Sequence, residues 1–244
     1  MERAEWLKQM RSMSEGLYDQ ISPAYWVTFG LYENETHREY LRKFLGRIRR
    51  GGTILSAACG AGRYDGMLLE AGHRVVGIDQ SEGMLGRARG HFPTVRYEKK
   101  GLQEIDFQQE FEGAICMDAM EHVCPEDWPE IMKRFHEALK PGGVLYFTVE
   151  IPESEEELKA SYERAKALGL PVVFGELADG VAASYEKVKA MTPPGTPGEL
   201  ADVAVYHYYP PLERLYLWIE QAGLTIEEDG TGSGYRHLIT RKPR

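Results

Sequence analysis

One stretch, residues 53–80, constrains the fold of this chain more than any other. It starts with a short apolar run, Ile54–Leu55, whose length suits a buried strand. Small residues follow from Ala57 to Gly62, and none of their side chains is large enough to keep a ligand away from the backbone. A helical segment closed by Gly72 and a second strand, Val75–Ile78, complete a strand–loop–helix–strand unit typical of open α/β sheets.

The second strand of this unit ends in a carboxylate, Asp79. In open α/β sheets a nucleoside ribose is held at such a strand tip, because a carboxylate can accept hydrogen bonds from two neighbouring hydroxyls. A turn or helix-capping carboxylate is the competing interpretation. The position of Asp79 directly after an apolar strand favours the ribose.

Composition limits the classes of partner. At 244 residues the chain fits one domain with an insertion better than two domains. Its formal charge of −9 would repel a phosphate backbone, so we expect no nucleic-acid partner. Three cysteines without paired metal-type spacing indicate reduced thiols, no metal site and a cytoplasmic protein. The sequence shows neither a signal peptide nor an apolar run of about 18 residues, so we expect no membrane partner.

Residues 1–50 precede the first strand and are predicted to form a helical cover. Asn34 is placed to cap a helix with an apolar stripe. Before it, residues 17–29 are rich in aromatic side chains and are broken by Pro23. We expect most of these rings to pack on the sheet and three to line the site: Tyr18, Tyr25 and Trp26.

Alternating strands and helices continue along the chain. Helices are predicted after a Ser81 cap, from Pro125 onward, and over Leu212–Ala222. Further strands are predicted at Val95–Tyr97, Ala114–Met117, Val144–Val149, Thr225–Glu228 and Tyr235–Thr240. The link between the last two strands is too short for a helical crossover, which predicts an antiparallel pair.

The stretch 151–206 breaks this rhythm and is predicted to be an inserted lid that covers the substrate. It contains an acidic helix at 153–168, a short apolar segment at 170–174 and a proline–glycine hinge at 191–198. The predicted organisation is therefore a cover at 1–50, a core at 51–150 and 207–244, and the lid.

Four motifs in order, together with the terminal hairpin, resemble the class I S-adenosylmethionine-dependent methyltransferase family. They are the glycine-rich loop at 55–63, the acid and helix at 77–85, the segment at 118–123 and the turn at 139–143. The resemblance implies a doubly wound, mostly parallel seven-stranded α/β sheet, which is Rossmann-like and ends in an antiparallel hairpin. It also implies S-adenosyl-L-methionine as cofactor and S-adenosylhomocysteine as product.

Carried over onto this sequence, the resemblance implies a set of cofactor-binding residues from the cover, the strand ends and the loops after them. These residues are Tyr18, Tyr25, Ser56, Ala57, Ala58, Cys59, Gly60, Gly62, Asp79, Gln80, Met84, Gly101, Leu102, Gln103, Met117, Asp118 and Ala119.

The sequence departs from the family pattern at three positions. Ser56 replaces the usual acid at the end of the first strand, and Ala58 replaces the first glycine of the loop. The missing carboxylate would help to orient the ammonium group of the cofactor, and a serine, a carbonyl or a water can substitute for it. Gly101 stands where an acid often lies near the adenine, so recognition there would use the amides around Leu102 and the side chain of Gln103. We expect these changes to tune cofactor affinity rather than to abolish it.

Methyl transfer from a sulfonium needs alignment above all, and it needs a base only when the acceptor must lose a proton. Two histidines are candidate catalytic bases, His122 and His207. The competing interpretations are a structural hydrogen bond to a backbone carbonyl for His122 and aromatic packing for His207.

The leading hypothesis is methyl transfer to an oxygen, nitrogen or carbon of a small-molecule acceptor, in a closed aromatic pocket, by a monomer or homodimer. A non-catalytic S-adenosylmethionine-binding module is the first alternative, motivated by Ser56 and Ala58. An NAD(P)-dependent oxidoreductase is the second. The sequence argues against it, because Asp65 occupies the place of the third glycine in the dinucleotide-binding pattern.

Overall fold

A computed structural model of the chain describes residues 3–30, 34–151, 182–188 and 203–244. The α-helices are α1 (Arg3–Tyr25), α2 (Glu35–Leu45), α3 (Asp65–Glu70), α4 (Glu82–His91), α5 (Trp128–Ala138) and α8 (Leu212–Gln221). Shorter helical turns are η1 (Trp26–Gly30), η2 (Leu102–Glu104) and η3 (Met120–His122). The strands are β1 (Thr53–Ala57), β2 (Arg74–Asp79), β3 (Arg96–Lys99), β4 (Phe111–Cys116), β5 (Leu139–Glu150), β6 (Ala182–Val188), β7 (Val203–Tyr209), β8 (Thr225–Gly232) and β9 (Tyr235–Arg241).

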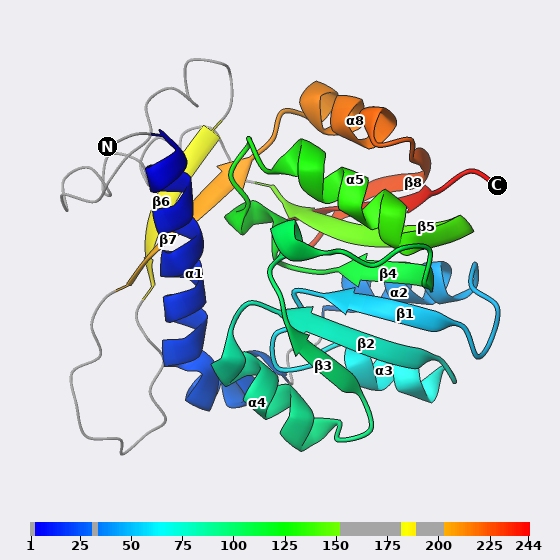
Figure 1. Cartoon of the computed structure of the whole chain (residues 1–244), viewed down its shortest axis with the longest axis horizontal. Helices are drawn as coiled ribbons and strands as arrows, with labels where there is room; N and C mark the ends of the chain where they lie inside the picture. The colour runs from blue at the N-terminus through cyan, green and yellow to red at the C-terminus, as the bar shows by residue number, and fades with distance from the viewer. Residues whose placement is uncertain (1–2, 31–33, 152–181, 189–202) are drawn as a thin grey trace.

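Seven of these strands form one sheet in the order β3-β2-β1-β4-β5-β9-β8 (Figure 1). Strands β1 to β5 are parallel, whereas β9 runs antiparallel to both β5 and β8. The predicted sheet, mostly parallel with a terminal antiparallel hairpin, is confirmed. The turn of that hairpin consists of Ser233 and Gly234, both at positive φ, which matches the twist of the two strands.

The sheet has a topological switch point beside β1. The chain builds outward from β1 through β2 to β3, and then crosses to the other side of β1 to form β4. Ligands of open α/β sheets bind in the crevice outside the carboxyl ends of the strands at this point. The fold therefore places a binding site at the ends of β1, β2 and β4.

Apolar residues pack on both faces of the sheet, as a doubly wound fold requires. On one face α3 and α4 cover β2 while α2 covers β5 and β9, with Phe44, Leu68 and Leu85 buried among these helices. On the other face α5 and α8 cover β4 and β5, and Trp128 stacks on Trp218 with ring centroids 5.4 Å apart.

The prediction that Pro23 breaks the N-terminal helix is wrong. Helix α1 continues through Pro23 to Tyr25, although proline cannot donate a hydrogen bond to the carbonyl of Asp19. The hydroxyl of Ser22 donates to that carbonyl instead, at 2.9 Å, so the backbone oxygen keeps a partner. As Figure 1 shows, the resulting long helix runs across one end of the sheet, beside the hairpin of β6 and β7. In the described part of the chain no helix is both long and apolar enough to cross a membrane.

Two other predicted boundaries are wrong. Helix α5 begins at Trp128 rather than near Pro125, with Pro129 in its first turn, where a missing N–H is tolerated. Strand β5 begins at Leu139, because this residue already pairs with Phe111 before a bulge at the proline–glycine turn.

The predicted caps are confirmed: Asn34 and Ser81 each accept a backbone hydrogen bond, from the N–H groups of His37 and Met84 respectively.

Strands β6 and β7 pair with each other in a separate two-stranded sheet, and both belong largely to the predicted lid. The predicted acidic helix at 153–168, the apolar segment at 170–174 and the hinge at 191–198 lie outside the described residues. At its end β7 is attached to the core, because Tyr208 is fully buried next to Trp128 and Trp218.

The two outer strands of the seven-stranded sheet carry charged side chains. On β3, Arg96 pairs with Glu98. On β8, Glu227 pairs with Arg47 of the segment after α2 and with Arg241 of β9.

Candidate functional site

A cavity that is open to solvent lies at the carboxyl ends of β1, β2 and β4, where the topology places a binding site. Helix α1 contributes Tyr18 and Tyr25 to its wall, and the loops after the strands contribute the rest. Of the residues predicted from the sequence, those that line it are Tyr18, Tyr25, Ser56, Ala57, Ala58, Cys59, Gly60, Asp79, Gln80, Met84, Gly101, Leu102, Gln103, Met117, Asp118, Ala119 and His122.

The loop after β1 forms the floor of the cavity and turns sharply. Ala58, Gly60 and Gly62 all have positive φ, at 50°, 53° and 83°. The loop is fastened to β2 by two hydrogen bonds, from the N–H of Cys59 to the carbonyl of Ile78 at 3.0 Å and from the N–H of Gly60 to Asp79 at 2.8 Å. The floor therefore consists of backbone atoms that these hydrogen bonds hold in place. A ligand can approach this backbone closely.

Two predicted residues, Gly62 and Trp26, are not among the described residues that line the cavity, and a third, His207, is not tested. A Cβ atom at Gly62 would lie 2.9 Å from the ring of Phe92, so this glycine allows the loop to pack on that ring. Trp26 stacks on His91 of α4 with ring centroids 3.7 Å apart. His207 lies in β7 opposite Ser184, and its side chain is outside the described residues.

Asp79 ends β2 and is almost fully buried under the cavity floor, with 8% of its surface exposed. One carboxylate oxygen accepts from the N–H of Ser81 at 2.9 Å, and the other accepts from the N–H of Gly60 at 2.8 Å. Burial raises the pKa of Asp79 to about 6, although these two hydrogen bonds act in the opposite direction. Each carboxylate oxygen has a second lone pair with which it can accept from a ligand hydroxyl.

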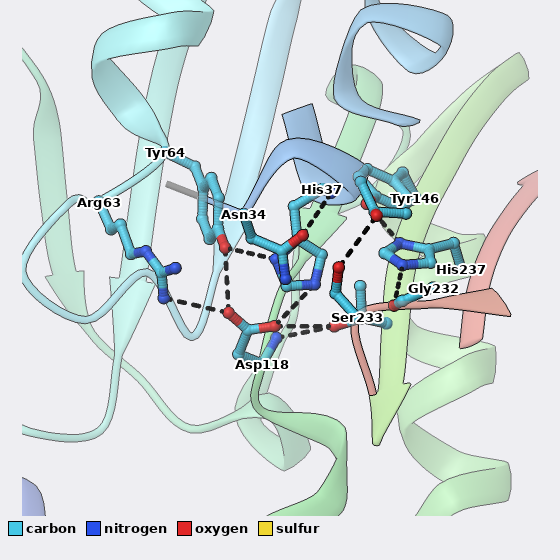
Figure 2. A network of polar contacts seen from close by, with 11 residues as sticks. Asn34, His37, Arg63, Tyr64, Asp118, Tyr146, Gly232, Ser233 and His237 are labelled. Carbon is cyan, nitrogen blue, oxygen red and sulfur yellow. Dashed lines mark hydrogen bonds and ion pairs between the residues drawn. The ribbon is translucent and has the colours of Figure 1, made fainter. Parts of the chain in front are cut away.

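Asp118 follows β4 and lies at the centre of a polar cluster, which Figure 2 shows. Its carboxylate accepts from the hydroxyl of Tyr64 at 3.0 Å and from the guanidinium of Arg63 at 3.2 Å. The hydroxyl of Thr148 donates to the same carboxylate at 3.4 Å and accepts from the backbone N–H of Asp118 at 2.8 Å. Burial raises the pKa of Asp118, while Arg63 acts to lower it.

His37 of α2 contacts two members of this cluster (Figure 2). Its Nε2 lies 3.3 Å from the carboxylate of Asp118, and its Nδ1 lies 3.2 Å from the hydroxyl of Tyr64. Burial lowers the pKa of His37 to about 3, so the imidazole is neutral at physiological pH. The ring of His37 also packs against that of His237, which is held by Tyr146 at 3.0 Å.

His122, one of the two predicted bases, lies in η3 on the cavity wall. Its Nε2 is 2.8 Å from the hydroxyl of Tyr18. Burial is the main cause that raises the pKa of Tyr18 well above its ordinary value, so the phenol is neutral at physiological pH. The hydrogen bond between Tyr18 and His122 joins α1 to η3 at the wall of the cavity.

Helix α1 is fastened over the cavity at two further points. Arg11 donates two hydrogen bonds to Asp127, and Gln103 donates to the same carboxylate at 3.1 Å. Asp19 accepts from the hydroxyl of Ser81 at 2.6 Å and from the N–H of Gly83 at 2.8 Å, at the start of α4.

Seven residues that line the cavity were not predicted: Arg11, Ser14, Arg63, Tyr64, Lys100, Ile115 and Val123. Arg63 and Tyr64 directly follow the small-residue loop, and this position is the one signal that could have found them. Nothing in the sequence marks His37, which reaches the site from a helix that precedes β1.

A fold with this strand order, and with a cavity at the switch point, defines a Rossmann-like α/β domain that binds its ligand at the ends of parallel strands. Comparison with known proteins makes this class more specific. Residues 54–143 match the methyltransferase domain family.

An uncharacterized methyltransferase of Synechocystis sp. is 32% identical over 99 residues, which are 40% of this chain and 47% of that protein. A ubiquinone biosynthesis O-methyltransferase of Hydrogenovibrio crunogenus is 27% identical over 164 residues, 63% of this chain and 66% of that protein. The chain thus spans about half to two thirds of the length of these curated relatives.

Solved structures of low sequence identity share the fold. An S-adenosylmethionine-dependent methyltransferase of Listeria monocytogenes superposes with a TM-score of 0.63 at 20% identity, covering 84% of this chain and 97% of that one. A didemethyltoxoflavin N1-methyltransferase of Burkholderia thailandensis superposes with a TM-score of 0.57 at 17% identity, covering 99% and 87%. Its structure contains 1,6-didemethyltoxoflavin and S-adenosylhomocysteine. Residues 54–143 of this chain thus match a methyltransferase domain, and the whole described sheet has the fold of these solved structures.

Proposed function

We propose that this chain is an enzyme that transfers the methyl group of S-adenosylmethionine to an oxygen, nitrogen or carbon of a small-molecule acceptor. The observation that carries the proposal is the arrangement of Asp79 beside the Ala57–Gly60 floor, in a cavity at the switch point of the sheet. In this arrangement a carboxylate and a tightly turned backbone face the same space, as a nucleoside requires.

The residues of the cavity fit such a cofactor. Asp79 has lone pairs for the two ribose hydroxyls, and the exposed backbone of the floor leaves room for the nucleoside. Asp118 and Arg63, which line the same cavity, would offer one negative and one positive group to the amino-acid end. Gly101 and Gln103, which also line the cavity, would contact the adenine.

When it is bound, S-adenosylmethionine supplies a methyl group activated on a sulfonium. The protein has to align the acceptor and exclude water, and alignment can supply roughly 7–11 kcal/mol of the barrier. Helix α1, fastened over the cavity by Arg11 and Asp19, would exclude water. His122 would take a proton from an acceptor that must lose one, and Tyr18 would orient its imidazole.

A concave cavity of this kind suits a small molecule better than a nucleic-acid duplex or a protein tail. One of the relatives is named an O-methyltransferase of ubiquinone biosynthesis, and one of the solved structures is named a methyltransferase of didemethyltoxoflavin, a small molecule. The same class of acceptor is proposed for this chain.

Isothermal titration with S-adenosylhomocysteine, followed by a screen of small nucleophiles for labelled methyl uptake, tests the proposal. We expect saturable binding that Asp79→Ala weakens at least tenfold.

We expect His122→Ala to lower turnover far more than cofactor affinity, and the same result for His207→Ala would assign the base to that residue instead. Absence of heat with both S-adenosylmethionine and S-adenosylhomocysteine would contradict the proposal. Binding without methyl uptake by any acceptor would favour a non-catalytic binding module.

A further inference from the structure

The side chains of His37, Tyr64 and Asp118 contact one another in a closed ring beside the cavity (Figure 2). The hydroxyl of Tyr64 lies 3.0 Å from Oδ2 of Asp118 and 3.2 Å from Nδ1 of His37. Nε2 of His37 lies 3.3 Å from Oδ1 of Asp118. Three polar contacts therefore join side chains from α2, from the loop after β1 and from the segment after β4.

This ring lacks one hydrogen when its three side chains are in their ordinary protonation states. A neutral imidazole carries one N–H, a phenol carries one O–H, and an ionised carboxylate carries no hydrogen. Two hydrogens cannot fill three contacts, so at one contact two acceptor atoms face each other. Nε2 of His37 is a buried atom without a hydrogen-bond partner among the described residues, although Asp118 lies close to it. A third proton would turn every contact of the ring into a hydrogen bond.

Burial decides which side chain of the ring takes this third proton. It lowers the pKa of His37 to about 3 and raises the pKa of Asp118, so the proton belongs on the carboxyl group. Protonated Asp118 then donates from Oδ1 to Nε2 of His37, and His37 donates from Nδ1 to the oxygen of Tyr64. The hydroxyl of Tyr64 donates to Oδ2 of Asp118 and closes the ring.

Charged and titratable groups from the neighbouring elements act on Asp118 in opposite directions. Arg63, at 3.2 Å, favours the ionised carboxylate, and the hydroxyl of Thr148 does so as well. Glu150 at the end of β5 favours the protonated form. The other titratable groups that interact electrostatically with Asp118 are Tyr18 and Tyr25 of α1, Cys116 of β4, Glu121 of η3, Tyr146 of β5 and Tyr235 of β9, and His237 of β9 acts on His37. A positive charge that arrives in the cavity adds to the influence of Arg63.

We propose that His37 is a positioning residue which, together with Tyr64, makes Asp118 hold a proton in the ligand-free protein and release it when the cofactor binds. This inference rests on the proposed function, in which the ammonium group of the cofactor comes to Asp118. The side chain of Asp118 lines the cavity and is 18% exposed, so a ligand cation can reach its carboxyl group.

The release is balanced in atoms and charge. The O–H bond of the Asp118 carboxyl group breaks, one proton passes to solvent, and an N–H of the ligand donates to the carboxylate instead. The ring keeps two hydrogens, and His37 then donates from Nε2 to Asp118. Binding of the cofactor is thereby coupled to proton release, and its affinity rises with pH.

Titration calorimetry in buffers of different ionisation enthalpy counts the protons that are released on binding. The pKa of Asp79 is raised to about 6, so a ligand with the ribose alone has to supply the baseline. Methylthioadenosine has the nucleoside and a thioether, whereas S-adenosylhomocysteine has the amino-acid end as well. As pH falls from about 8 to about 5, S-adenosylhomocysteine should release increasingly more protons than methylthioadenosine, up to one per site.

His37→Gln tests the positioning role, because an amide donates to Asp118 without a proton that titrates. The variant should still bind S-adenosylhomocysteine, but the excess of released protons over methylthioadenosine should disappear. Tyr64→Phe removes two contacts of the ring and should lose the excess as well. His136→Gln is the matched control: burial also lowers the pKa of His136, but this residue lies in α5 and is not among the described residues that line the cavity. Its excess should equal that of the wild type.

A further measurement uses wild-type protein alone and so does not depend on how the variants fold. The analogue of S-adenosylhomocysteine in which hydrogen replaces the amino group brings no cation, so it should release as many protons as methylthioadenosine. Equal release with S-adenosylhomocysteine and methylthioadenosine at every pH would overturn the inference and leave the proposed function intact. A wild-type excess in His37→Gln that retains the wild-type circular dichroism spectrum would overturn it as well. Failure of wild-type protein to bind either S-adenosylhomocysteine or methylthioadenosine would instead overturn the proposed function.

Discussion

Ala58 is held at a φ of 50° in the floor of the cavity, a conformation that costs an L-residue roughly 1–2 kcal/mol. We therefore predict that Ala58→Gly raises the free energy of unfolding by about 1 kcal/mol, because glycine adopts this conformation without the clash. Urea unfolding followed by fluorescence measures the change. Ala61→Gly in the same loop is the control, since Ala61 is buried and has no positive φ, and it should lose about 1 kcal/mol. A loss of stability in both variants would contradict the strain at Ala58.

Asp79 makes stability depend on pH. Burial raises its pKa from 3.8 to about 6, so between these values the native state holds a proton that the unfolded chain has lost. This contribution is fully present below the unfolded pKa and is lost as pH rises through the folded pKa. The free energy of unfolding should therefore fall across this window, by at most about 1.4 kcal/mol per pH unit from this residue.

Urea titrations across the same window measure this slope. Asp79→Asn has no titrating group at the position, so its slope should be shallower than that of the wild type. Other buried acids with raised pKa values, such as Asp65 and Asp118, contribute equally to both proteins and cancel in the comparison. Parallel slopes would show that Asp79 titrates alike in the native and unfolded states.

Most of the cavity could be predicted at the scale of single residues, because the strand–loop–helix–strand unit brings its own motifs to one edge of the sheet. The residues that hold the carboxylate of Asp118 in place could not be predicted. His37 belongs to a helix that precedes β1, and only the packing of α2 on the sheet brings it within 3.3 Å of the carboxylate. Gly62 was assigned to the cofactor for its place in the motif, whereas its contact with Phe92 depends on how α4 ends.

At the scale of elements, α1 is attached to the rest of the site through Asp19, which accepts two hydrogen bonds from the first turn of α4. We predict that Asp19→Ala speeds backbone hydrogen exchange in the second half of α1 and in the first turn of α4. The variant should also lose about 1–2 kcal/mol of stability, because two donors lose their partner. Exchange measured by mass spectrometry reports each segment separately.

Glu15→Ala is the matched control on the same helix. Glu15 pairs with Lys99 at 2.7 Å on the exposed surface, and such pairs contribute little. Hydrogen exchange of the Glu15→Ala variant should resemble that of the wild type. If both variants speed exchange equally, the contact of Asp19 with α4 does not hold α1 in place.

The sequence predicts the elements themselves well, since their apolar periodicities are clear, and fails where side chains replace backbone partners. Pro23 is an example, because the hydroxyl of Ser22 supplies the hydrogen bond that proline cannot make. The early start of β5 is another, because a bulge carries the proline–glycine turn within the strand pairing.

At the scale of the whole molecule, the N-terminal segment is part of the core as well as a cover. Phe44 of α2 is fully buried against β4 and Tyr146 of β5. We predict that Phe44→Ala costs about 3–5 kcal/mol of unfolding free energy, measured by denaturant titration. Val27 belongs to the same segment but is 78% exposed, so Val27→Ala should change stability by less than about 0.5 kcal/mol. A small effect of Phe44→Ala would mean that the segment only rests on a core that is complete without it.

The charges on the outer strands have a consequence for concentrated solutions of the protein. An open sheet ends in strands with unused N–H and carbonyl groups, which invite another chain to add a strand and begin aggregation. Approach of a second sheet to β3 would bring Arg96 and Glu98 against its edge, and approach to β8 would disturb the ion pairs of Glu227. Both edges thus oppose self-association by strand addition.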